Sequence, residues 1–336
     1  MMALLPFLLA LSSITGSTRT VDSLAFAPQF QLPNIFNALA NNINKIAATK
    51  STFSYTHLEG NGQLWQATNG NTKASIVIDP LASQLDFGIP WGYRANKQSI
   101  SEQATIDLIC DAQPSHCLLT MGLDDHTHLP TLEKLRERMP ELRYIVAPSC
   151  EKKLLDFGLR ADQITVLDHG ESCQLSGDAT ATVTATQGAL VGPPWQKREN
   201  GFLLELNSAK EENGGVSIYY EPHGDVVLDN IKHLRADIMV SPVTKQSLPA
   251  QVPTEGQFTL VYGGDRTLEI AESLGVEVVV PLGNGALRIE GPLAGLVSAS
   301  GDVSDFEKLV EQRNIGSEDA IRVAKATPGV PLTVSV

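Results

Sequence analysis

The stretch Thr120-Met-Gly-Leu-Asp-Asp-His-Thr-His-Leu-Pro-Thr131 joins a short apolar run, which begins at Cys117, to a segment with helical character. The apolar run predicts a buried strand, and ligands commonly bind where strands of an α/β sheet end. Asp125, His126 and His128 carry oxygen and nitrogen atoms of the kind that bind metal ions. We therefore expect the functional site at this stretch.

The chain on both sides of this stretch predicts a mixed α/β fold. The runs 58–66 and 74–79 read as a hairpin around the turn Asn69-Gly70-Asn71, and Pro80 ends the second strand. A further strand is expected at 106–110. Strands dominate the first half of the chain, and strands alternate with helices in the second half. This order predicts a four-layer αββα sandwich, with two sheets face to face and helices outside.

The stretch resembles the signature of the metallo-β-lactamase superfamily, His-x-His-x-Asp-His at the end of a strand. Asp125 and His126 match the final Asp-His, whereas Met121 and Leu123 stand where the first two histidines would be. The resemblance implies the αββα fold and a structural role for Asp79 at the end of the second hairpin strand. It also implies a site that normally holds two zinc ions, whose bound hydroxide attacks the substrate.

The resemblance places the other ligand positions on later loops. The loop 186–195, where a third histidine is expected, contains none. The family's bridging aspartate falls on His223, two residues after Glu221, in Ile218-Tyr-Tyr-Glu-Pro-His223. The last histidine position offers only Asn284. We therefore do not expect an ordinary two-zinc site.

Five candidate metal ligands remain on two loops that the family fold would bring together. Three or four of them could hold one divalent metal, zinc or else iron or manganese, with a position open to water. On this hypothesis the protein hydrolyses an ester, lactone or phosphodiester, and Asp125 and Glu221 take part in catalysis, Glu221 as a ligand or general base. The candidate ligands are Asp125, His126, His128, Glu221 and His223.

The competing hypothesis is a catalytically inactive, metal-free member that keeps the pocket to bind a small molecule or a protein. Asp124 and Asp125 precede a helix, where carboxylates also satisfy free amide groups. His126 and His223 would then be hydrogen-bonded core residues. The two hypotheses differ in whether the donor atoms of Asp125, His126 and His223 converge on one point.

The loop Gly192-Pro-Pro-Trp-Gln-Lys-Arg-Glu-Asn-Gly201 resembles a segment of superfamily lactone hydrolases and lipid phosphodiesterases. Trp195, Trp91 and Tyr93 are candidates for the wall of an apolar pocket, and Lys197 or Arg198 for contact with a carboxylate or phosphate. The loop can equally serve to cover and stiffen a sheet edge.

The N-terminus predicts targeting. Residues 1–25 read as a signal peptide, and residues 26–52, which contain no Asp or Glu, as a plastid transit peptide. The junction Ser23-Leu-Ala-Phe-Ala-Pro28 resembles the bipartite signal of algae with secondary plastids, which predicts a plastid stroma. The alternative is an ordinary secretory signal followed by a linker.

Charge and hydropathy limit the partners. The formal net charge is -13 at pH 7, without a cluster of Lys or Arg, which argues against nucleic acid or an anionic membrane. No later apolar run reaches membrane-spanning length, so we expect no stable membrane insertion. The expected partner is a small-molecule substrate. Residues 53–300 are the expected metallo-β-lactamase-like domain, and residues 301–336 are an expected C-terminal extension over one edge.

Overall fold

The computed structural model describes residues 52–69, 72–175, 181–192, 195–206, 215–248, 258–283, 287–316 and 320–335. The chain divides between Ala48 and Thr49, and the description below concerns the second unit. The expected signal peptide, and the expected transit peptide up to residue 51, lie outside the described residues. Within the described part of the chain, no helix combines the length and apolar character that a membrane span requires.

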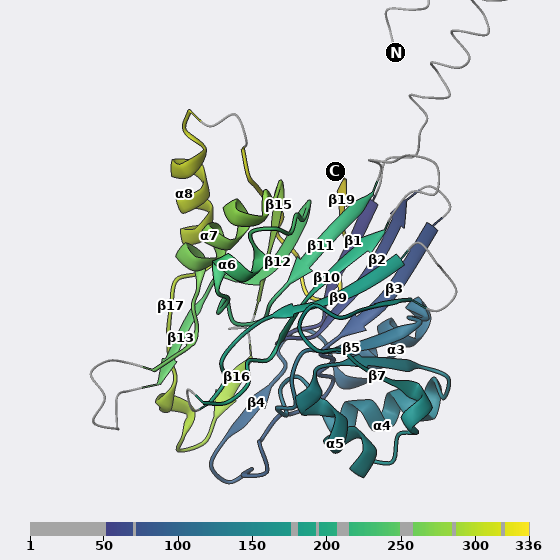
Figure 1. The fold of residues 1–336 in the computed structure, drawn as a ribbon. Helices are drawn as coiled ribbons and strands as arrows, with labels where there is room; N and C mark the ends of the chain where they lie inside the picture. Colours follow the sequence, from purple (N-terminus) through teal and green to yellow (C-terminus); the bar gives the residue numbers. More distant parts are fainter. Residues whose placement is uncertain are drawn as a thin grey trace, which may run out of the picture. The chain divides into compact units, whose positions relative to one another are not determined.

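The first sheet contains the early strands and one strand from the C-terminus. Its strand order is β19-β1-β2-β3-β5-β6-β7 (Figure 1). The pairs from β19 to β3 are antiparallel, and those from β3 to β7 are parallel. The strands are β1 (Thr52–His57), β2 (Gln63–Asn69), β3 (Thr72–Ile78), β5 (His116–Leu119), β6 (Arg143–Val146), β7 (Ile164–Val166) and β19 (Leu332–Ser335).

The second sheet has the strand order β18-β15-β12-β11-β10-β9-β8. In this order, each pair of neighbours from β8 through β11 is antiparallel, and each pair from β11 through β18 is parallel. The strands are β8 (Ser172–Gln174), β9 (Ala181–Gln187), β10 (Asn200–Leu206), β11 (Val216–Tyr220), β12 (Ile238–Pro242), β15 (Val278–Leu282) and β18 (Arg322–Val323).

The helices lie on the outer faces of the two sheets (Figure 1). Apolar residues of α3, α4 and α5 pack on the outer face of the first sheet, and those of α6, α7 and α8 on the second. This confirms the predicted αββα architecture. The helices are α3 (Glu102–Ala112), α4 (Leu129–Arg138), α5 (Pro148–Asp156), α6 (Leu228–Ile231), α7 (Gly264–Leu274) and α8 (Val303–Asn314), with 3₁₀ turns at Ala161–Gln163 and Ala294–Leu296.

Alternation along the strands separates the layers. In β3, Ile76 and Ile78 enter the core between the sheets, while Val77 faces the helices. In β11, Ile218 and Tyr220 enter that core, and Tyr219 faces α6 and α7. Successive side chains of a strand point to opposite faces, so both faces of these strands must be apolar.

The run 106–110, predicted to be a strand, lies within helix α3, so this prediction was wrong. Ser101 caps the helix by accepting a hydrogen bond from the Ala104 amide, and Glu102 occupies its first turn. Thr105, Ile106 and Ile109 form its buried face. The spacing of these positions is helical, and a short apolar run alone does not distinguish a strand from a helix.

Residues 301–336 extend both sheets. Strand β19 pairs with β1, and strand β18 pairs with β15, so the C-terminal segment adds an edge strand to each sheet. Between them and the main body, α8 contributes Phe306 and Val310 to the outer core of the second sheet. The segment expected as an extension over one edge is thus hydrogen-bonded into both sheets.

Two small sheets stand at the end of the sandwich where the site is found. One has the order β14-β13-β17, with strands Phe258–Val261, Lys245–Leu248 and Ser298–Ser300; the other pairs β16 (Arg288–Glu290) with β4 (Arg94–Asn96). Gly291 follows β16 at a φ of 106°, and a side chain there would collide with the Gly92 carbonyl. Glycine at this position therefore permits the close approach of the segments that pair as β16 and β4.

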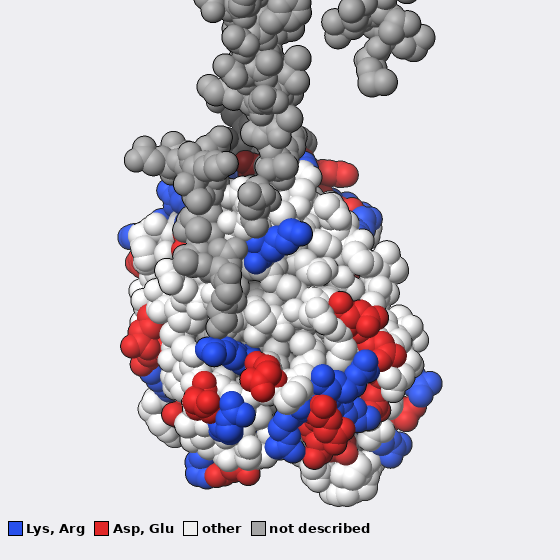
Figure 2. Space-filling view, turned by 90° about the vertical axis from the view of Figure 1, so that its right-hand side faces the viewer, with Lys and Arg blue, Asp and Glu red and all other residues white. Residues whose placement is uncertain are grey.

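Charges on the described surface are mixed. On the face that carries α3 and α4, acidic and basic side chains lie intermingled (Figure 2). Several form ion pairs between or within the outer helices, among them Arg138 with Asp107 and Lys152 with Asp156.

Candidate functional site

The ends of three strands position the candidate site. Asp79 follows β3, Thr120 follows β5, and Glu221 follows β11. Because β3 and β5 are parallel neighbours, their carboxyl ends share one edge of the first sheet. The second sheet supplies β11 from across the sandwich, where the Tyr220 hydroxyl lies 3.4 Å from Asp79 Oδ2.

Asp79 is a fully buried carboxylate that organises the first cluster. Its Oδ1 accepts from the Thr120 amide at 2.9 Å, and its Oδ2 accepts from the Thr120 hydroxyl at 2.6 Å. The same Oδ2 lies 2.7 Å from His126 Nδ1. Asp79 has a φ of 41°, a left-handed conformation that costs energy for a residue with a side chain. The hydrogen bonds with Thr120 and the contact with His126 hold it in this conformation.

His126 is fully buried and has a carboxylate near each ring nitrogen. Burial alone would lower the pKa of His126, but the charges of Asp125 and Asp79 outweigh it and raise the pKa to about 9. Its Nε2 lies 3.1 Å from the Asn61 amide nitrogen and 3.5 Å from Asp125 Oδ2. A charged imidazolium requires the amide oxygen of Asn61 at this place, which is a 180° turn of that amide.

Glu221 and His223 form the second cluster. Glu221 is buried, and its Oε2 accepts hydrogen bonds from the backbone amides of His223 at 3.1 Å and Asp225 at 3.0 Å. Burial raises the pKa of Glu221 to about 7. Burial and the neighbouring His126 lower the pKa of His223 to about 3, so its ring is neutral at pH 7. The rings of His126 and His223 lie 5.4 Å apart, which joins the two clusters.

The structure therefore brings four of the five candidate ligands together. The fifth, His128, precedes α4 and lies 2.8 Å from the Thr131 hydroxyl through its Nδ1. Burial lowers its pKa. Its described contacts join it to the start of α4 and not to Asp125, His126 or His223.

The donor atoms of the described residues do not form the set of three protein ligands that a catalytic zinc site takes. Asp125 Oδ2 and His126 Nε2 are close enough, at 3.5 Å, to share one cation. Within the described ranges, however, no three His, Cys, Asp or Glu side chains converge on a point that could hold a metal ion. Asn284, the remaining candidate at the last ligand position, lies outside the described residues.

The two residues that replace the signature histidines have different surroundings. Met121 is fully buried, whereas Leu123 is 43% exposed and lines a pocket. The pocket has a volume of about 280 Å³, and Asn61, Asp125 and His223 contribute to its polar lining. Most of its wall is apolar, including Leu81, Leu85, Leu123, Val261, Leu287 and Ile289.

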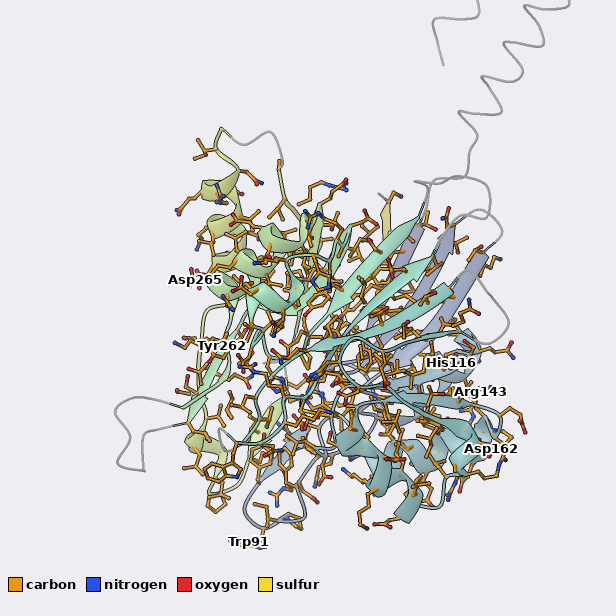
Figure 3. The ribbon with its side chains drawn as sticks, viewed as in Figure 1. Trp91, His116, Arg143, Asp162, Tyr262 and Asp265 are labelled. Atoms are coloured by element: carbon orange, nitrogen blue, oxygen red, sulfur yellow. The ribbon has the colours of Figure 1, made fainter. Side chains whose placement is uncertain are left out.

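The pocket wall differs from the one expected from the sequence. Tyr93 lines it, but Trp91 and Trp195 do not, and these two are 74% and 86% exposed. Trp91 points outward at the tip of the loop before β4 (Figure 3). Lys197 pairs with Asp168, and Arg198 pairs with Asp225 and with two backbone carbonyls. Both cations are therefore bound by the protein itself.

Asn61 is a site residue that the sequence did not reveal. It lies in the turn between β1 and β2, and its amide contacts both Asp125 and His126. Its neighbours Gly60 and Gly62 signal a turn. They do not signal what the turn touches, because the contact spans more than sixty positions of the chain.

His126 predicts a specific pH dependence of stability. Its folded pKa of about 9 exceeds the ordinary value of 6.5, so its contribution is complete below about pH 6.5 and is lost as pH rises through 9. We expect the stability difference between the parent and His126→Gln to fall by up to about 1.4 kcal/mol per pH unit across this window. Urea unfolding at a series of pH values measures it.

His116 provides the matched control. It is also buried, but burial lowers its pKa to about 4, so it binds no extra proton on folding above pH 6.5. The His116→Gln variant should keep the parent's pH dependence in the alkaline window. A parallel pair of curves for the parent and His126→Gln would show that His126 is not charged in the folded protein.

Comparison with known proteins was made at the levels of sequence and fold. A family model described as a β-lactamase superfamily domain matches residues 56–283. No curated protein matches the sequence.

Three solved structures are similar in fold. The metallo-β-lactamase fold protein YhfI from Bacillus subtilis has a TM-score of 0.48 at 9% identity, over 85% of this chain and 100% of that one. A long form RNase Z from yeast has a TM-score of 0.43 at 9% identity. The match covers 78% of this chain and 43% of the RNase Z chain. A protein described as a Zn-dependent hydrolase of the metallo-β-lactamase superfamily from Thermotoga maritima has a TM-score of 0.35 at 10% identity. The match covers 82% of this chain and 100% of that chain.

Proposed function

This chain belongs to the metallo-β-lactamase superfamily, and from that premise we propose that it binds a small, largely apolar molecule without a two-metal site. Members of the superfamily are commonly metal-dependent hydrolases. The observation that carries the proposal is the position of Leu123, a residue at a family ligand position that here lines an apolar pocket. The polar residues among the described lining of the pocket are Asn61, Tyr93, Asp125, His223 and Gln246.

The state of the two clusters supports binding rather than metal chemistry. His126 Nδ1 is engaged by Asp79, and its Nε2 faces Asn61, so both ring nitrogens already have protein partners. Among the described contacts, the other side-chain atom within 3.5 Å of His126 Nε2, besides the Asn61 amide, is the carboxylate oxygen Oδ2 of Asp125. An apolar wall with a few polar groups is typical of sites that bind small ligands. The volume of about 280 Å³ lies just below the usual range for such sites, roughly 300–1,000 Å³.

Binding of neutral aromatic fragments tests the proposal. Indole and 4-ethylphenol would be titrated by ligand-observed NMR against the protein comprising residues 49–336, the parent, and against two variants of it. Leu123→Trp adds bulk at the pocket, and Leu155→Trp adds it on α5 at a residue with the same exposure of 43%. We expect parent and Leu155→Trp to bind with Kd near or below about 1 mM, and Leu123→Trp to bind at least about tenfold more weakly. Equal binding by the two tryptophan variants, or none by the parent, would contradict the proposal.

The hydrolase hypothesis is separated from this proposal by elemental analysis. The parent and the double variant His126→Ala/His223→Ala would be incubated with zinc, iron or manganese and then freed of excess metal. We expect no stoichiometric metal in either protein. One equivalent in the parent and none in the variant would overturn the metal-free proposal and justify assays with esters, lactones and phosphodiesters.

A further inference from the structure

Three buried polar atoms, two of them on residues that line the pocket, have no hydrogen-bond partner among the described residues. They are Asp125 Oδ1, Glu221 Oε1 and His223 Nδ1. Glu221 is 1% exposed and His223 is 9% exposed, and His223 lines the pocket. A buried polar group without a partner is costly, roughly 1–3 kcal/mol each. Such groups are rare in folded proteins, and a ligand that supplies hydrogen-bond donors would satisfy them.

The charge of the pocket favours a cation. The described residues that line it include one carboxylate, Asp125, and neither lysine nor arginine. The closest cations that the sequence suggested, Lys197 and Arg198, are paired with Asp168 and Asp225. The charged His126 ring lies 3.5 Å from Asp125 Oδ2 but is fully buried and does not line the pocket, so an anionic ligand would meet the Asp125 carboxylate and no cation at the pocket surface among the described residues.

An aromatic pair completes the arrangement. Phe87 and Tyr93 both line the pocket, and their ring centres lie 5.5 Å apart in a tilted arrangement. Burial and, next, the charge of Asp125 raise the pKa of Tyr93. Cations bind over aromatic faces and near carboxylates, and desolvation strengthens both interactions.

We infer that the pocket selects a small organic cation, an ammonium group on an apolar body, with the nitrogen near Asp125 and His223. The inference rests on the proposed function and names the class of its ligand. The ammonium N–H groups supply the donors that Asp125 Oδ1 and the His223 ring lack. The apolar body lies against Leu81, Leu123 and Ile289 in the part of the wall without charge.

Three ligands of one shape test the inference. Binding of 2-phenylethylamine, its neutral analogue 2-phenylethanol and the anion phenylacetate would be measured by NMR titration at about pH 7. We expect the amine to bind at least about tenfold more tightly than the alcohol, and phenylacetate to bind most weakly. Added salt should weaken binding of the amine and leave binding of the alcohol unchanged.

Two neighbouring variants locate the preference. Asp125→Asn should reduce the tenfold preference for the amine over the alcohol to less than about threefold. Asp124→Asn should keep the preference, because Asp124 pairs with Lys153 and does not line the pocket. Thermal unfolding of both variants verifies that they remain folded.

The outcomes separate the inference from the function on which it rests. If the alcohol or phenylacetate binds the parent as tightly as the amine, the cation preference is wrong and the binding pocket stands. If the preference persists in Asp125→Asn, the inferred position of the cation is wrong. If none of the three ligands binds, both the inference and the proposed function fall.

Discussion

Replacing Asp79 by alanine should lower the free energy of unfolding by about 3–5 kcal/mol, the usual cost of breaking a buried ion pair. The carboxylate is fully buried and accepts from Thr120 twice, while His126 lies 2.7 Å away. Its removal leaves a buried imidazolium without its carboxylate partner, with only the Thr120 hydroxyl at 2.9 Å from Nδ1, and a backbone amide without an acceptor. Urea unfolding followed by circular dichroism measures the loss.

Two further variants separate pairing from packing. Asp124→Ala removes a carboxylate that is 46% exposed and pairs with Lys153, and it should cost no more than about 1 kcal/mol. The double variant Asp79→Ala/His126→Ala should lose less than the sum of the two single variants, because the unpaired charge is gone. Strict additivity, or a loss below about 1 kcal/mol for Asp79→Ala, would show that the pair is not a charged one.

The site could be located from the sequence because its residues follow strands. Asp79, Asp125 and Glu221 each come directly or shortly after an apolar or β-branched run. Such runs predict strands, and parallel strands place their carboxyl ends at one edge. This rule, together with the family signature, predicts from the sequence that His126 and His223 lie close together. The structure places their rings 5.4 Å apart.

Local pattern could not fix what each donor atom contacts. His128 lies only two positions after His126 in the sequence. It stands at the start of α4, however, and its side chain contacts the Thr131 hydroxyl instead of the cluster around His126. Asn61 reaches the site from a turn more than sixty residues earlier. Whether donors converge on a metal depends on such distant contacts, which neither periodicity nor motif spacing records.

The errors in the fold have the same origin. A short apolar run at Ile106–Cys110 fits a strand or a helix, and the cap at Ser101 decides for the helix. The strands β18 and β19 are short, two and four residues, and carry little pattern of their own. They form because β15 and β1 offer free edges, a fact of the assembled sheets and not of the local sequence.

Ring contacts connect Trp65 in the core to Tyr220 beside the site, and the second large effect is expected at Trp65. Trp65, in β2, is 1% exposed between the sheets. Its ring lies 5.3 Å from that of Phe53 and 6.2 Å from that of Tyr220, both edge-to-face, and Tyr220 in turn reaches Asp79. Trp65 also donates from Nε1 to Gln63 Oε1 at 2.9 Å.

Trp65→Ala should therefore lower the free energy of unfolding by about 3–5 kcal/mol, the usual cost of deleting a buried aromatic side chain. The cavity, the two lost ring contacts and the unpaired Gln63 oxygen all contribute. Trp91→Ala, at a residue that is 74% exposed, should stay within about 0.5 kcal/mol of the parent. Urea unfolding by circular dichroism compares the two, because tryptophan fluorescence would itself change.

A second readout shows whether the core positions the site. Removal of Trp65 frees the ring of Tyr220 to move, and with it the hydroxyl that faces Asp79. If the link holds, the Trp65→Ala protein, under conditions where it remains folded, should also lose affinity for pocket ligands, while Trp91→Ala keeps it. Unchanged binding in a destabilised Trp65→Ala protein would mean that Asp79 is held by Thr120 and His126 alone, and that the two sheets fix the site independently of the packing between them.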